Sequence, residues 1–254
     1  MGFFDKKYCD VCGEKIGLLG NRKLEDGNLC KNCAKLLSPF FSDRRQSTVA
    51  DIKEQLAYRE ANKAAVQAFR VTRTLGGSTK VLLDEDAGKF IVTPFSRWQE
   101  ENPDVLDFSQ VTGCNLDITE SRTELKEEDA EGNERSYSPP RYHYSYDFHM
   151  IIHVNSPWFD EIRFRLNNRD IDQALARGIF MQSDEDRRNT VEYREHEALG
   201  QEIKEALSQV RQNVRDNIAA ANAPKTAQIC PLCGATTTPD ANGRCEYCGG
   251  AVQG

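Results

Sequence analysis

The chain of 254 residues carries a formal net charge of −7, and 29% of its residues are charged against 39% hydrophobic. This length suffices for one core with small appendages or for two domains. The acidic balance argues against a protein that mainly wraps nucleic acid, because that affinity rests on Lys and Arg. The sequence shows no apolar stretch of membrane-spanning length and no secretory signal, so we expect a reducing, cytoplasmic environment. There, the nine cysteines indicate metal binding rather than disulfides.

The first predicted element is a four-cysteine zinc finger within residues 1–46. Its candidate ligands form two C-x-x-C pairs, Cys9, Cys12, Cys30 and Cys33. Their spacing is typical of zinc sites. Gly13 permits a tight knuckle after the first pair, whereas Ala34 and further helix formers follow the second. Asp26-Gly27 predicts a hairpin between the pairs. Knuckle, hairpin and a cysteine pair entering a short helix together predict a treble-clef-like finger.

Residues 42–69 predict a mostly helical segment, with Ser47 or Thr48 as its N-cap. From Thr79 onward the hydrophobic pattern changes from a helical period to alternation. This change predicts a hairpin with strands at 81–83 and 90–93.

Two more strands are predicted over 105–110 and 112–121. Cys114 lies on the second, and we interpret it as a buried small apolar residue rather than a nucleophile, because no histidine base lies beside it. The segment 124–141 is acidic and contains Gly and Pro, so we expect a mobile loop between strands.

Residues 141–154 form the clearest strand pattern, with aromatic and aliphatic residues alternating with polar ones. Residues 158–166 are expected to pair with it. Three histidines share the polar face with Asp147, namely His143, His149 and His153. We favour a solvated face over a third metal site, because a site also needs ligands from other strands.

The C-terminal part begins with an ambiguous stretch, residues 170–190, and continues as a long amphipathic helix over 191–223. Gly200 is its one weak point, and Pro224 ends it. The apolar stripe favours packing on the chain's own sheet. The alternative is a short coiled coil that forms a dimer through helix 191–223.

The last predicted element is a second four-cysteine set, a zinc ribbon within residues 224–254. Its candidate ligands are Cys230, Cys233, Cys245 and Cys248. Here both pairs carry a knuckle glycine, Gly234 and Gly249, and Asn242-Gly243 predicts a hairpin turn. A module this short buries little core, so metal supplies most of its folding free energy.

Two structural Zn²⁺ ions per chain are therefore expected. Four thiolates use every tetrahedral position and leave none for water, which argues against hydrolysis at either end. Iron in a rubredoxin-like site, which uses the same knuckles, remains an alternative. The redox interpretation of C-x-x-C requires a thioredoxin-like βαβ context, and neither end has one.

The opening, DKKYCDVCGEKIGLLGNRKLEDGNLCKNC, resembles the N-terminal zinc-finger-like domain of a bacterial family of unknown function. The segments KVLLDEDAGKF and HVNSPWFDEIRF and the CPLCGA and CEYCGG tail extend this resemblance along the chain. It implies metal binding by the eight paired cysteines. The middle also resembles pleckstrin-homology-like domains, in which a C-terminal helix closes a curved sheet.

The expected fold class is α+β: an antiparallel, barrel-like middle domain with a C-terminal amphipathic helix, flanked by two four-cysteine modules. The predicted division is a finger (1–46), a helical linker (47–70), the sheet domain with its closing helix (71–223) and a ribbon (224–254).

For function we expect a non-catalytic adaptor with a protein partner, because the sequence carries no catalytic motif. One alternative is nucleic-acid binding through the fingers. Residues 1–46 hold nine Lys or Arg and six Asp or Glu, and the −2 charge of a zinc-thiolate centre leaves only about +1. Another alternative is binding to an anionic membrane surface through the sheet domain, with a basic cluster of Arg141, Arg163, Arg165 and Arg169.

Overall fold

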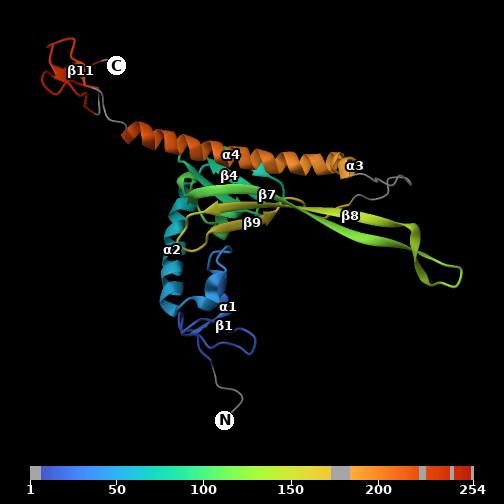
Figure 1. The fold of residues 1–254 in the computed structure, drawn as a ribbon. Coiled ribbons are helices and arrows are strands. Elements are labelled where there is room, and N and C mark those ends of the chain that lie inside the picture. Colours follow the sequence, from blue (N-terminus) through green and yellow to red (C-terminus); the bar gives the residue numbers. More distant parts are fainter. Residues whose placement is uncertain (1–6, 173–183, 223–226, 241–242, 253–254) are drawn as a thin grey trace. The chain divides into compact units, whose positions relative to one another are not determined.

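The computed structural model describes residues 7–172, 184–222, 227–240 and 243–252. The chain divides into two compact units, Met1–Gln212 and Asn213–Gly254 (Figure 1). Among the described residues, no helix has the length and apolar character needed to cross a bilayer. The finer four-part division stays a prediction.

The first unit begins with the finger and a long helix. Its elements are β1 (Arg22–Lys23), β2 (Asn28–Leu29), α1 (Lys31–Lys35), the 3-10 helix η1 (Asp43–Gln46) and α2 (Val49–Ala68). Strands β1 and β2 pair antiparallel, as the hairpin prediction requires. The predicted cap is Thr48, whose side chain accepts from the Asp51 N–H while Asp51 accepts from the Thr48 N–H.

The finger has an apolar core besides its cysteines. Five aliphatic side chains fill it, Ile16, Leu24, Leu29, Leu37 and Ile52. The last of these comes from α2, so the start of this helix is packed against the finger. Burial of apolar side chains therefore stabilises the finger in addition to any metal ion that its thiols bind.

The first sheet has the strand order β3-β4-β5-β6 and is antiparallel throughout. Its strands are β3 (Arg73–Gly76), β4 (Lys80–Asp84), β5 (Lys89–Thr93) and β6 (Leu106–Asp107). The β4–β5 hairpin confirms the predicted one. The predicted strand over 105–110 is mostly wrong, because a capping box between Asp107 and Gln110 turns the chain into the 3-10 helix η3 (Phe108–Gln110). A further 3-10 helix, η2, covers Trp98–Glu101.

The second sheet is built on two long strands. Its strands are β7 (Val111–Glu128), β8 (Glu134–Val154), β9 (Glu161–Arg165) and β10 (Ile171–Asp172). Strand β8 pairs antiparallel with β7, β9 and β10. Both sheets have open strand orders, so the described strands do not close into the barrel that the sequence led us to expect. The α+β class with antiparallel sheets is confirmed.

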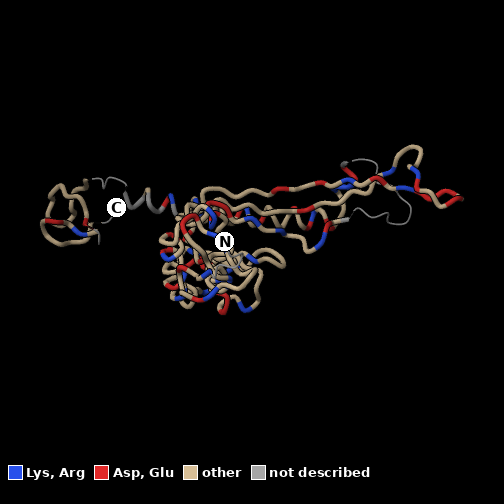
Figure 2. The backbone as a smooth tube through the Cα atoms, turned by 90° about the horizontal axis from the view of Figure 1, so that it is seen from below, with Lys and Arg blue, Asp and Glu red and all other residues tan. Residues whose placement is uncertain are grey.

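The expected loop over 124–141 is wrong, because β7 and β8 extend through most of it as a ribbon. Ion pairs cross this ribbon: Arg135 lies opposite Glu127 at 3.0 Å, and Lys126 lies diagonally 3.6 Å from Glu134. Figure 2 shows this mixture of acidic and basic residues along the hairpin. The register shifts between Leu125 and Lys126, which leaves 137–140, with two prolines, outside one-to-one pairing.

The C-terminal helices are α3 (Asp184–Arg188) and α4 (Val191–Asn222). Within the first unit, α4 packs on the second sheet, and Figure 1 shows it running beside β7. Its Tyr193 ring meets Phe148 of β8 at 5.0 Å, and Ile203 and Leu207 are fully buried. This part of the apolar stripe thus packs on the chain's own sheet, as favoured over a coiled coil. The predicted residues Val214 and Ile218 lie outside the described side chains.

The second unit contains a small ribbon with two short antiparallel strands, β11 (Gln228–Ile229) and β12 (Thr236–Thr237). Its buried apolar cluster consists of Cys230, Cys245 and Val252. One valine and two cysteines bury too little area to hold a fold by themselves.

Candidate metal centres

The N-terminal set brings four sulfur atoms together. The Sγ atoms of Cys9, Cys12, Cys30 and Cys33 all lie within 4.8 Å of one another. The Sγ atoms of Cys12 and Cys30 are 3.7 Å apart. Zn–S bonds of about 2.3 Å in a regular tetrahedron place sulfur atoms about 3.8 Å apart. The spacing of these thiols therefore fits a tetrahedral ion at their centre.

The C-terminal set has the same arrangement. Its four Sγ atoms, from Cys230, Cys233, Cys245 and Cys248, also lie within 4.8 Å of one another. The Cys230–Cys248 and Cys233–Cys245 sulfur distances are 3.6 and 3.7 Å. Both distances again match a tetrahedral edge.

Three of the four C-x-x-C pairs form the same knuckle. In each, the first cysteine donates its N–H to a carbonyl five residues later and accepts from the glycine four residues later; these first cysteines are Cys9, Cys230 and Cys245. The glycines Gly13, Gly234 and Gly249 have φ of 76°, 69° and 69°. A side chain with a Cβ is strained in that region, which explains the glycine that follows each knuckle.

The fourth pair enters a helix, as Ala34 indicated. Cys30 is the N-cap of α1, and its sulfur accepts from the Cys33 N–H at 3.3 Å. The Cys30 N–H in turn donates to the Cys9 sulfur at 3.3 Å, which ties the helix start to the knuckle. The two ends of the chain thus hold different modules. The predicted turn residue Asn242 lies outside the described residues.

The thiols of the N-terminal set differ in pKa. Burial opposes ionisation of Cys9, but the N–H groups of Cys12, Cys30 and Val11 donate to its sulfur and lower its pKa to about 6. Burial, together with the neighbouring sulfurs, raises the pKa of Cys33 well above its ordinary value. In the absence of a cation, four crowded thiolates are therefore unfavourable.

The C-terminal set shows the same contrast. Burial works against Cys245, but the Cys248 and Tyr247 N–H groups lower its pKa to about 6. The Gly250 N–H favours the Cys248 thiolate, but the Cys233 and Cys230 thiols outweigh it and raise the pKa of Cys248 to about 12. A divalent cation relieves this repulsion and permits all four thiolates.

The remaining predicted residues do not join either set. Cys114 is buried, and burial raises its pKa to about 12, so it is an inert thiol. His143, His149 and His153 are half-buried on β8, where the His153 ring lies 4.0 Å from Glu161. Within the described ranges, the two four-cysteine sets are the groups of metal-ligating side chains that converge.

Three of the four arginines in the expected basic cluster on the sheet domain pair with carboxylates. Arg163 pairs with Asp117 at 2.8 Å, Arg165 contacts Asp147 and Asp170, and Arg169 lies 3.6 Å from Glu192. Arg141 stacks over the Tyr137 ring, with its guanidinium carbon 4.3 Å from the ring centroid. These side chains do not form a free positive surface.

Sequence reasoning missed the apolar side chains that both modules expose. In the finger, Leu18 and Leu19 are 84% and 88% exposed. In the ribbon, Ile229, Leu232 and Tyr247 are each more than two-thirds exposed. The only sequence signal was the position of large apolar residues inside modules too short to bury them.

The comparisons bear on the finger. No curated protein and no solved structure matches the chain. Residues 7–55 match the family model of a domain of unknown function (DUF4428). The match spans the N-terminal cysteine set and the first turns of α2, the same stretch that shares the finger's apolar core.

Proposed function

We propose that this protein is a zinc-binding, non-catalytic scaffold, whose two metal-built modules present surfaces to a protein partner. One observation carries the proposal: each end brings four cysteine sulfurs to tetrahedral spacing with every position taken by protein. Closed four-thiolate sites are structural, because no position is open for water or substrate. The metal would then act by holding a surface in shape.

Zinc is proposed over iron because it is a borderline-soft ion without redox chemistry and with no geometric demand beyond the tetrahedron. Iron in a four-thiolate site is the runner-up. The eight cysteines of the two sets would be the ligands, four for each ion.

The exposed apolar side chains support the proposal that a protein partner binds the two modules. Isolated surface leucines are ordinary, but here they gather on both metal modules. The Leu18–Leu19 pair lies in the loop between the finger's cysteine pairs, and Tyr247 lies inside the second ribbon knuckle. The metal would thus hold rigid the same loops that display these side chains.

Metal analysis of the purified full chain tests the first part. We expect two zinc ions per chain by mass spectrometry and no visible absorption. One ion or none would overturn the scheme, and intense visible colour with bound iron would assign the sites to iron instead.

Site-specific photocrosslinking in the protein's native host tests the partner. A benzophenone amino acid replaces Leu19 or Tyr247, and the exposed Lys53 serves as the control position. We expect discrete adducts from Leu19 and Tyr247 that disappear when the same chain carries Cys30→Ser or Cys245→Ser, respectively. Equal adducts at Lys53, or adducts unaffected by loss of the metal ligand, would contradict the scaffold role.

A further inference from the structure

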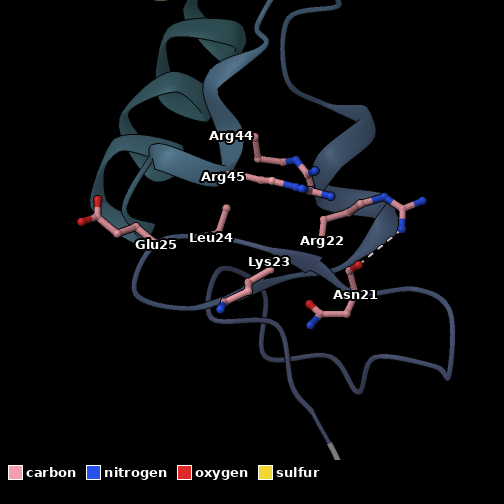
Figure 3. A pocket seen from close by; sticks show the side chains of 7 residues that line it. All are labelled: Asn21, Arg22, Lys23, Leu24, Glu25, Arg44 and Arg45. Carbon is pink, nitrogen blue, oxygen red and sulfur yellow. Dashed lines mark hydrogen bonds between the residues drawn. The ribbon is translucent and has the colours of Figure 1, made fainter.

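A pocket of about 660 Å³ lies beside the finger's hairpin, between β1 and η1. Its volume falls in the range of small-molecule sites. The residues around it include Arg22 and Lys23 from β1 and Arg44 and Arg45 from η1 (Figure 3). The four thiols of the finger do not line it, so the pocket is separate from the metal centre.

Three arginines, Arg22, Arg44 and Arg45, line this pocket. Figure 3 shows the ends of Arg44 and Arg45 close together and extending toward Arg22. The carboxylate of Glu25, which also lines the pocket, lies on the far side and points away from them. Arg22 is anchored by donating Nη1 to the carbonyls of Leu19 and Asn21, at 3.3 and 3.4 Å.

The gathered charges lack a countercharge. Arg44 is half-buried, and its Nη1 is shielded from solvent without a hydrogen-bond partner. In the part of the chain that the structure describes, no carboxylate pairs with Arg44 or Arg45. Burial, followed by the charges of Arg22 and Arg45, lowers the pKa of Arg44. Proteins rarely leave a buried guanidinium donor unsatisfied, because doing so costs free energy.

We propose that this pocket binds the phosphate group of a small phosphate monoester, through the guanidinium groups of Arg22, Arg44 and Arg45. A phosphate monoester carries about −1.5 to −2 charge and three strong acceptor oxygens, which three guanidinium groups match. A carboxylate offers one charge and two oxygens, so it would leave part of the cluster uncompensated. Planar guanidinium forks also bind phosphate oxygens in pairs.

The grouping of these arginines around one pocket favours a small ester over a nucleic-acid strand. A strand requires a basic stripe that follows successive phosphodiesters, each with a single charge. Here the three arginines line a single pocket instead of forming a track. The weak net charge of the finger does not supply the remaining contacts of a strand.

Calorimetric titration of the zinc-loaded full chain in low-salt buffer tests the proposal. The probes are phenyl phosphate, benzoate as its carboxylate counterpart, and a 12-nucleotide single strand without a terminal phosphate. We expect phenyl phosphate to bind roughly tenfold more tightly than benzoate or the strand. The double variant R44Q/R45Q should lose roughly tenfold or more in affinity for phenyl phosphate.

The matched control is K35Q/K53Q, which removes the same charge from the finger and α2 at two exposed positions outside the pocket. It should retain the affinity of the unmodified chain within about twofold, since only long-range charge changes. Zinc content and circular dichroism report folding. If R44Q/R45Q does not fold, R45Q alone decides, because Arg45 is exposed, and it should weaken binding severalfold.

Three results would overturn the proposal. One is that phenyl phosphate does not bind the folded chain at millimolar concentration. Another is that K35Q/K53Q loses as much affinity as the arginine variants. The third is that the strand binds more tightly than phenyl phosphate, which would assign the pocket to nucleic acid.

Discussion

Arg59 of α2 and Asp104 form a buried ion pair, with Nη1 and Oδ1 2.7 Å apart and side chains only 7% and 0% exposed. Ser38 donates its hydroxyl to the other Asp104 oxygen at 2.8 Å. Arg59 also donates to the carbonyls of Leu36 and Asn102. One carboxylate therefore joins the end of the finger, the long helix and the segment before β6.

The first prediction concerns this pair. Burial raises the pKa of Asp104 more than the Arg59 charge lowers it. At pH 7, Arg59→Met should leave an unpaired buried carboxylate and reduce the free energy of unfolding by about 3–5 kcal/mol. A group with a raised folded pKa costs stability only once it ionises, so this loss should shrink at pH 5. Urea unfolding at both pH values measures it.

The control for that prediction is Arg97→Met, which breaks an exposed pair with Glu100. Its cost should stay within about 1 kcal/mol at both pH values. Adding Asp104→Asn to Arg59→Met should restore part of the lost stability, because the uncompensated charge is gone. A loss from Arg59→Met that stays unchanged at pH 5 would show that burial of Asp104 is not its cause.

The second prediction concerns metal stoichiometry. Cys245→Ser removes one of four thiolates at the ribbon and should reduce bound zinc from two equivalents to one. Cys114→Ser changes a buried thiol outside both sets and should leave two. Metal content by mass spectrometry, measured on both variants after the same purification, distinguishes them. Equal loss in the two variants would mean that the ribbon set is not a separate site.

The third prediction concerns metal removal. Each ligand must lose its proton to bind, so both acid and a chelator should release metal. The ribbon should then unfold entirely, because its apolar cluster beyond two cysteines is Val252. The finger should keep part of its structure through Leu24, Leu29 and Ile52. Amide resonances of the two modules, followed by NMR during chelation, measure this order. Loss of the finger's resonances before those of the ribbon would contradict the prediction.

The fourth prediction concerns Gly200 of α4. A Cβ built there would lie 2.6 Å from Leu116 Cδ1 on β7, which is closer than real contacts allow. Gly200→Ala should therefore destabilise the fold by about 1 kcal/mol or more, although Ala favours a helix over Gly by a similar amount. In a Leu116→Ala background the clash is gone, and Gly200→Ala should instead stabilise by about 1 kcal/mol. Thermal unfolding of the unmodified chain, the two single variants and the double variant checks this reversal of sign.

Local spacing predicted most of what surrounds the two sulfur clusters. A C-x-x-C pair with a following glycine closes within a single turn, so Gly13, Gly234 and Gly249 could be interpreted without any knowledge of distant contacts. The same holds for Cys30 at the start of α1 and for the Thr48 capping box, which involve residues at most a few positions apart.

Patterns that depend on partners were less reliable. The sequence of 124–141 predicts a loop because it is acidic and contains Gly and Pro. In the fold, Glu127 lies opposite Arg135 and Lys126 forms a diagonal ion pair with Glu134, so these opposite charges support the ribbon. Likewise, the sequence predicts a basic surface from Arg163, Arg165 and Arg169. In the fold, each of these arginines pairs with a carboxylate.

By itself, then, the sequence determined the two sets of four cysteines, the type of each knuckle and the alternation of the main strands. Only the tertiary structure decided that Arg59 meets Asp104, that Gly200 lies against Leu116, and that Arg44 and Arg45 extend toward Arg22. The reason is physical. Knuckles, caps and strand alternation arise from the geometry of neighbouring residues, whereas these contacts join residues about 20 to 80 positions apart, which only packing brings together.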